Sequence, residues 1–107
     1  SSIYILQHIQ KNYPTVTLSY LADFYNYSER QIQRIVRSAT GKSFQQLILD
    51  LRMMAAGKYL SAGMSIPAIA EAIGYYDASS FRRAFRSYFG VTPNEYRETT
   101  DGSSLRD

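Results

Sequence analysis

The sequence predicts an all-α fold of about seven helices, with two tandem helix-turn-helix subdomains joined by a long central helix. Three observations support this fold class. Apolar residues recur at the i, i+3, i+4 spacing of one helix face in segment after segment. The pattern of the first half returns in the second half at a period of roughly fifty residues. In each half, one helix carries arginines opposite its apolar side.

Two short helices open the chain. Residues 3–13 form the first, which Pro14 ends because a proline disfavours helical geometry in the preceding residue. Thr17 opens the second, residues 17–25, and Asn26 ends it as the non-glycine residue that best tolerates a left-handed turn. The predicted buried positions are Ile5, Leu6, Ile9, Tyr13, Leu18, Leu21, Ala22 and Tyr25. His8 has no metal-ligating or catalytic partner nearby in sequence, so we expect an ordinary surface or boundary residue.

The third helix, residues 28–39, has one apolar and one basic face. Ser28 with Gln31 forms a capping box at its start, and Gly41 ends it. Its predicted buried side consists of Ile32, Ile35, Val36 and Ala39. Its predicted exposed side consists of Arg30, Gln33, Arg34 and Arg37. Residues 1–42 are therefore predicted to form the first subdomain.

Residues 43–62 form the longest predicted helix, which Ser43 caps together with Gln46. It has two apolar faces, one with Phe44, Leu47, Ile48, Leu51, Ala55 and Tyr59, the other with Leu49, Met53, Ala56 and Leu60. We therefore expect it to be buried between two bodies. At about 1.5 Å per residue it spans roughly 27 Å, close to one DNA turn of about 34 Å. Gly57 costs about 1 kcal/mol relative to alanine there, and close packing is the only explanation the sequence offers.

The second subdomain, residues 63–98, repeats the first. A helix over 66–73 has the buried stripe Ile66, Ile69, Ala70 and Ile73, and Gly74 ends it. Tyr75 and Tyr76 are expected to fill the corner before Asp77, which caps the helix over 77–89. That helix has the apolar side Phe81, Ala84, Phe85 and Tyr88 and the opposite side Ser79, Arg82, Arg83 and Arg86.

The chain closes with a capped short helix and a polar segment. Thr92, with Pro93 at the first helical position and Glu95 three residues after Thr92, forms a further capping box. Residues 99–107 lack periodicity and are predicted to be a disordered tail.

The two halves align residue by residue. Leu21-Ala22 matches Ile69-Ala70, and Asn26-Tyr27 matches Gly74-Tyr75. After one extra residue in the second turn, the matched pairs are Ile32 with Phe81, Arg34 with Arg83, Arg37 with Arg86, Gly41 with Gly90 and Ser43 with Thr92.

Composition excludes several functional classes. The chain has no cysteine, so it has neither disulfides nor thiol chemistry. Asp23, Asp50 and Glu71 are scattered and do not join histidine in a catalytic or metal-binding set, so we expect no enzyme, metal site or cofactor. No apolar run approaches the roughly 20 residues that span a bilayer, and no signal peptide is visible, so we expect a cytoplasmic location.

Two basic helix faces, each on the second helix of a helix-turn-helix, favour binding to double-stranded DNA. Phosphates require positive charge. Base edges in the major groove require arginine for guanine, glutamine for adenine, and small groups for close approach. Arg30, Gln33, Arg34, Ser79 and Arg83 supply these groups.

The pattern resembles the DNA-binding domain of the AraC/XylS family of bacterial transcription regulators. The signature runs through Ile66, Ile69-Ala70, Gly74-Tyr75, Ser80-Phe81, Arg83, Phe85, Phe89 to Pro93 and Tyr96-Arg97, with upstream agreement at Leu21-Ala22, Ser28, Gln33-Arg34, Gly41 to Ser43, Arg52, Ala56 and Leu60. The resemblance implies that both recognition helices enter successive major-groove segments. It implies base contacts by Arg30, Gln33, Arg34, Ala78, Ser79 and Arg83, and with them we expect backbone contacts by Ser28, Arg37, Lys42, Ser80, Arg82 and Arg86. Tyr75 and Asn26 stand where the family usually has Phe and Gly.

The resemblance also implies that this chain is a fragment of a larger, effector-responsive regulator, which we expect to be an activator. Its effector would bind a domain absent from this chain. RNA polymerase is a further expected partner. The alternative interpretation is a helical protein-interaction module that contacts the transcription machinery without reading DNA. That alternative predicts weak salt dependence of DNA binding, whereas phosphate contacts predict a steep one.

Overall fold

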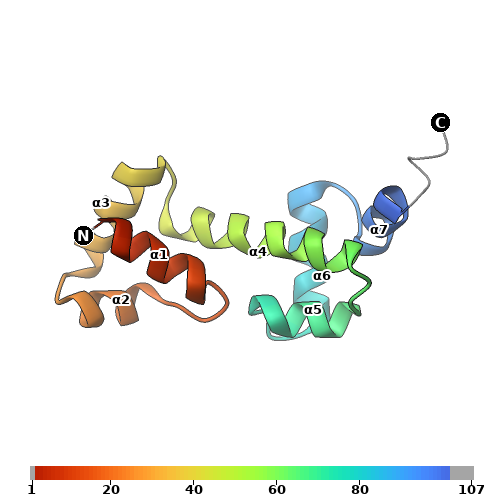
Figure 1. Cartoon of the computed structure of the whole chain (residues 1–107), viewed down its shortest axis with the longest axis horizontal. Helices are drawn as coiled ribbons and strands as arrows, with labels where there is room; N and C mark the ends of the chain where they lie inside the picture. Colours follow the sequence, from red (N-terminus) through yellow and green to blue (C-terminus); the bar gives the residue numbers. More distant parts are fainter. Residues whose placement is uncertain (1, 102–107) are drawn as a thin grey trace. The chain divides into compact units, whose positions relative to one another are not determined.

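The computed structural model describes residues 2–101, and within that range the chain forms seven α-helices, as predicted (Figure 1). They are α1 (Ser2–Asn12), α2 (Leu18–Tyr25), α3 (Glu29–Thr40), α4 (Phe44–Ser61), α5 (Ile66–Ile73), α6 (Ala78–Phe89) and α7 (Pro93–Asp101). The chain divides between Leu51 and Arg52 into two compact units, unit 1 and unit 2, so the boundary falls inside α4.

Unit 1 is built around α3, which packs against both α1 and α2. Its apolar core contains Ile5, Ile9, Leu21, Ala22, Ile32, Val36 and Phe44. Within α3, Ile32 and Val36 have no exposed surface, and each lies one turn from the other. Burial of this face fixes the rotation of α3 about its axis and leaves its basic side in solvent.

In unit 2, α6 packs against α5, as α3 packs against α2, and also against the following helix α7. All four predicted stripe residues of α5 are buried, namely Ile66, Ile69, Ala70 and Ile73. Phe81 and Phe85 of α6 have no exposed surface. Phe85 meets Tyr96 of α7 edge to face, with ring centroids 5.3 Å apart, a favourable arrangement for aromatic pairs.

The two apolar faces of α4 serve different halves of that helix. The first face packs on the unit 1 core through Leu47, Ile48 and Leu51, beside the buried Phe44. The second face is buried in the unit 2 half, at Met53, Ala56 and Leu60. Leu49, expected on the second face, is only half-buried. The first face therefore contributes mainly to the unit 1 core, and the fully buried residues of the second face lie in unit 2.

The helix-turn-helix corners of the two units end their first helix in the same way. Asn26 and Gly74 both adopt left-handed backbone conformations, with φ of 58° and 102°. The next residue donates its N–H back to the first helix in each case: Tyr27 to the Ala22 carbonyl at 2.9 Å and Tyr75 to the Ala70 carbonyl at 2.8 Å. These bonds satisfy carbonyl groups that the helix itself leaves free. The predicted equivalence of Asn26 and Gly74 is confirmed.

Short side chains cap the N-termini of α3 and α6, the second helix of each helix-turn-helix. Ser28 Oγ accepts the Gln31 N–H at 3.1 Å, and Gln31 Oε1 accepts the Ser28 N–H at 2.8 Å, which confirms the capping box. At α6, Asp77 Oδ1 accepts the Ser80 N–H at 2.8 Å and the Ser80 hydroxyl at 2.7 Å. These side-chain and backbone hydrogen bonds, helped by the charge of Arg83, lower the pKa of Asp77.

Helices α7 and α4, which follow α6 and α3, are also capped. Glu95 accepts the Thr92 N–H at 2.8 Å and donates its own N–H to Thr92 Oγ1 at 3.1 Å. These bonds, with a smaller effect of Arg86, lower the pKa of Glu95. At α4, Ser43 Oγ accepts the Gln46 N–H at 3.1 Å, but the Gln46 side chain donates to Asp50 instead of completing a box.

Several predicted positions differ in the structure. Ala39 and its repeat partner Tyr88 were expected to be buried, yet Ala39 is exposed and Tyr88 is 39% exposed. Both lie in the last turn of their helix, where the apolar side is only partly covered: in α6, Phe89 contacts Tyr96 of α7 while Tyr88 stays exposed. Tyr76, expected to fill the corner, is 98% exposed. Helix α7 continues to Asp101, so the tail predicted over 99–107 is helical at its start, and the rest lies outside the described residues.

Gly57 has a structural reason that the sequence did not supply. A Cβ atom at this position would lie 2.8 Å from Oη and 3.4 Å from Cζ of Tyr96. The Tyr96 ring cannot easily retreat, because it contacts both Phe85 and Phe89, with ring centroids 5.3 and 5.1 Å away. Glycine therefore allows α7 to approach α4 closely.

We expect Gly57→Ala to lower the free energy of unfolding, because the added methyl group displaces the Tyr96 ring and this cost outweighs the gain in helix propensity. In the Tyr96→Phe background the closest contact is absent, so the same substitution should stabilise by up to about 1 kcal/mol. Urea unfolding of the four proteins in this double-mutant cycle, followed by circular dichroism, measures both effects. A gain in stability of Gly57→Ala with Tyr96 intact would contradict the packing argument.

The lowered pKa values of Asp77 and Glu95 predict a stability that depends on pH. A carboxyl group whose pKa is lower in the folded state contributes stability above its unfolded pKa, about 4, and loses it as pH falls through the folded value. The melting temperature should therefore decrease from pH 5 downward, and Asp77→Asn/Glu95→Gln, which keeps both caps, should decrease less. Identical pH profiles of the two proteins would show that these carboxylates contribute nothing.

Candidate nucleic-acid interface

The exposed side of α3 presents the side chains expected to contact DNA in unit 1. Arg30, Gln33, Arg34 and Arg37 are all exposed, as predicted from their position opposite Ile32 and Val36. Three of the four are cationic, and guanidinium groups bind phosphate and guanine with two parallel hydrogen bonds. The face therefore has both the charge and the donors that a major groove requires.

A groove of about 410 Å³ runs beside this face. It is lined by Leu18, Arg30, Gln33, Arg34, Arg37, Ser43, Phe44 and Gln45. The N-terminus of α4 thus closes one side of a channel whose other side is the arginine face of α3. Backbone N–H groups at a helix N-terminus favour anions, so the groove is suited to a phosphate group.

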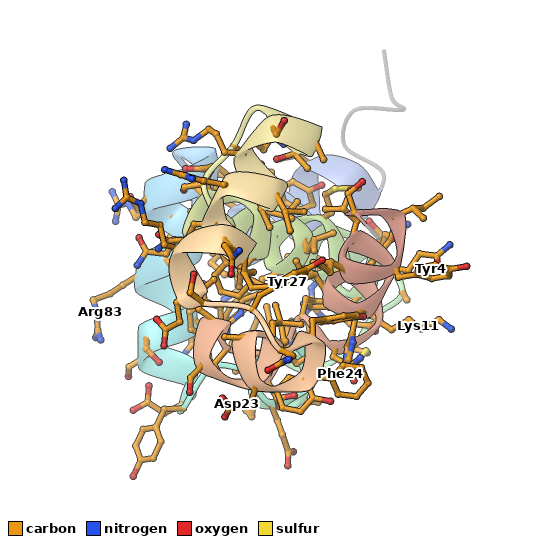
Figure 2. The ribbon with its side chains drawn as sticks, turned by 90° about the vertical axis from the view of Figure 1, so that its left-hand side faces the viewer. Tyr4, Lys11, Asp23, Phe24, Tyr27 and Arg83 are labelled. Atoms are coloured by element: carbon orange, nitrogen blue, oxygen red, sulfur yellow. The ribbon has the colours of Figure 1, made fainter. Side chains whose placement is uncertain are left out.

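Unit 2 presents the equivalent surface on α6. Ser79, Arg82, Arg83 and Arg86 are exposed, and Ala78 is half-buried. The side chain of Arg83 extends from the ribbon into solvent in Figure 2. A groove of about 700 Å³ beside this face is lined by Arg82, Arg83, Arg86, Ser87, Thr92, Pro93 and Asn94. It occupies the same place relative to α6 and α7 as the first groove does relative to α3 and α4.

Three of the predicted backbone-contacting residues have partners within the protein. Lys42 Nζ lies 2.6 Å from Asp50 Oδ2, so this ammonium group is already paired. The Ser80 hydroxyl donates to Asp77 at the start of α6, and Ser80 is half-buried there. Ser28 uses its hydroxyl oxygen as a cap acceptor, so what it can offer DNA is the hydroxyl hydrogen.

Tyr76 is a surface residue that sequence reasoning placed incorrectly. It is the extra residue in the second turn, directly before the Asp77 cap, and its ring is almost fully exposed. Tyr75, in contrast, packs on Phe81 with ring centroids 5.9 Å apart and lies under the guanidinium of Arg52 at 4.8 Å. Only one of the two adjacent tyrosines therefore stabilises the corner.

Unit 1 also has an aromatic cluster away from the α3 face. The His8 ring meets Tyr20, Phe24 and Tyr25 edge to face, and His8 Nδ1 lies 3.0 Å from Tyr25 Oη. Burial, with a smaller effect of Tyr20, raises the pKa of Tyr25. Phe24 remains 60% exposed and Tyr4 66% exposed, and both project from the ribbon in Figure 2.

A metal-binding cluster and a membrane-spanning helix are both absent from the part of the chain that the structure describes. No group of three or more histidine, aspartate or glutamate side chains there could hold a metal ion. Among the described helices, none combines the length and the apolar character needed to cross a membrane.

Comparisons with known proteins agree with this architecture. A family profile described as "Helix-turn-helix domain" matches residues 21–99. The raffinose operon transcriptional regulatory protein RafR of Pediococcus pentosaceus is 31% identical over 96 residues, which cover 88% of this chain and 35% of RafR. The RCS-specific HTH-type transcriptional activator RclR of Escherichia coli K12 is 34% identical over 83 residues, covering 77% of this chain and 29% of RclR.

Among solved structures, the C-terminal domain of AraT, a response regulator from Geobacillus stearothermophilus, is 34% identical with a TM-score of 0.88, covering 99% of this chain and 90% of that chain. The chain spans about a third of the length of the curated relatives it matches. The predicted family is confirmed: the chain belongs to the AraC/XylS type of helix-turn-helix, the DNA-binding domain of transcription regulators.

Proposed function

We propose that this chain binds double-stranded DNA sequence-specifically, with α3 and α6 in successive major-groove segments. The observation that carries the proposal is the repeated surface: each unit buries the apolar side of its recognition helix and exposes three arginines on the other. A single basic helix face is commonly just solvated. Two equivalent faces on equivalent corners, each beside a groove suited to phosphate, favour a shared duplex as the ligand.

Within this function, we assign base contacts to Arg30, Gln33, Arg34, Ala78, Ser79 and Arg83. Arg34 and Arg83 occupy equivalent positions in the repeat and are suited to guanine O6 and N7. Ala78 has only a methyl group to offer, which suits contact with a thymine methyl. Backbone contacts are assigned to Ser28, Arg37, Lys42, Ser80, Arg82 and Arg86, of which the three arginines line the two grooves.

The proposed role of the whole protein is transcription activation in bacteria. RclR, one of the relatives, is named as a transcriptional activator, and RafR as an operon regulator. A regulator of this type acts on promoters in the cytoplasm. An effector would bind another part of the full-length regulator, since this chain spans about a third of the length of RafR and RclR.

A second candidate function, contact with RNA polymerase, is favoured by the aromatic cluster of unit 1. Tyr4, Tyr20 and Phe24 expose large rings on α1 and α2, and they are not among the residues that line the α3 groove. Exposed aromatic side chains that gather in one place are typical of protein interaction sites.

The DNA-binding proposal is tested with Arg34→Ala and Arg83→Ala on the site recovered by selection from random duplexes. Each variant should lose about 1–3 kcal/mol of binding free energy and relax sequence preference in one half of the site, because each removes one guanine contact. Lys58→Ala, which removes an exposed charge of α4 outside both grooves, is the matched control. Unchanged affinity and preference in both arginine variants would defeat the assignment.

The RNA polymerase contact is tested with Phe24→Ser and Tyr4→Ser in a transcription assay on the same site. Both variants should bind the duplex like the parent protein and yet activate less, since the exposed rings do not approach DNA in this proposal. Equal loss of DNA binding and activation would assign these residues to the DNA surface or to folding, and full activation would remove the second candidate.

A further inference from the structure

The internal repeat allows the charges of the two recognition surfaces to be compared position by position. Residues 28–46 and 77–95 are equivalent segments of equal length, each comprising a recognition helix, its caps and the start of the next helix. The first contains four basic residues and one acidic residue, a net charge of +3. The second contains three basic and two acidic residues, a net charge of +1.

Both acidic residues of the second segment are fixed beside its arginines. Asp77 is held at the N-cap of α6 by Ser80. Arg83 lies on the same helix, and its charge acts on the Asp77 carboxylate. Glu95 is held on the Thr92 N–H, and Thr92 lines the same groove as Arg86. Hydrogen bonds lower the pKa of both carboxyl groups, so both are ionised near neutral pH.

The equivalent positions in unit 1 are uncharged. Ser28 stands in the place of Asp77, and Gln46 stands in the place of Glu95. Asp50, just outside the segment, neutralises Lys42 in an ion pair 2.6 Å long. With that pair counted, the net charge of the first segment falls to +2, which is still above the +1 of the second. The acidic residue of the first segment is Glu29, whose counterpart in unit 2 is Ala78. The caps are thus chemically interchangeable for helix stability, since serine and aspartate cap equally well, but they differ in charge.

We infer that the two units bind DNA unequally, with unit 1 supplying the larger phosphate-dependent share of affinity and Asp77 and Glu95 reducing the share of unit 2. The inference rests on the proposed DNA-binding function. A fixed carboxylate near a phosphate group repels it and also reduces the field of the neighbouring arginine. Unit 2 then distinguishes between DNA sequences through Arg83 and Ser79, but it adds little affinity that is independent of sequence.

Charge exchange between equivalent positions tests this inference. Asp77→Asn/Glu95→Gln removes both charges from unit 2 and keeps both cap acceptors, while Ser28→Asp/Gln46→Glu introduces them in unit 1. Affinity is measured over a range of salt concentrations on a random-sequence duplex of about 30 base pairs, long enough for two major-groove segments one turn apart. Asp23→Asn/Glu71→Gln changes the net charge equally outside the two segments, and thermal melting checks folding.

The unit 2 exchange should tighten binding at least about fivefold and steepen its salt dependence, while the unit 1 exchange should weaken binding by a similar factor. The control pair should change affinity less than either. Changes no larger than those of the control would overturn the inference while leaving DNA binding intact. Failure of the parent chain to bind either the random duplex or a selected site would instead overturn the proposed function.

Discussion

The burial of one side of each recognition helix is the constraint on which this structure depends. Ile32 and Val36 in α3, and Phe81 and Phe85 in α6, have no exposed surface. Because a helix is rigid, fixing its apolar side also fixes the opposite side, and the arginines are thereby directed to solvent. The same burial that stabilises each unit therefore creates its binding surface.

Around this constraint the two units use the same corner with different residues. Asn26 and Gly74 reach the same left-handed conformation, and Ser28 and Asp77 cap the following helix through the same kind of hydrogen bond. Duplication thus preserves backbone geometry, which tolerates several side chains, while leaving the charge of the caps free to differ. The proposed inequality of the two units arises from that freedom.

Much of the fold followed from local rules. Apolar spacing located the helices, and short polar residues located most of the caps, because both depend on neighbours within about four residues. The same rules failed for Ala39 and Tyr88, whose spacing suits a buried face but which stay exposed in the last turn of their helices. They also failed for Tyr76, since two adjacent tyrosines look alike in sequence and only one of them finds a packing partner.

The sequence by itself determined the helices, the repeat and which side of each recognition helix is basic, because periodicity and composition are properties of contiguous residues. Tertiary structure alone decided which residues of different helices contact one another. These contacts place Tyr96 over Gly57, Arg52 on Tyr75, and the N-termini of α4 and α7 beside the arginine faces. These contacts join residues on different helices, and their distances depend on how side chains of different helices pack, which no local pattern records.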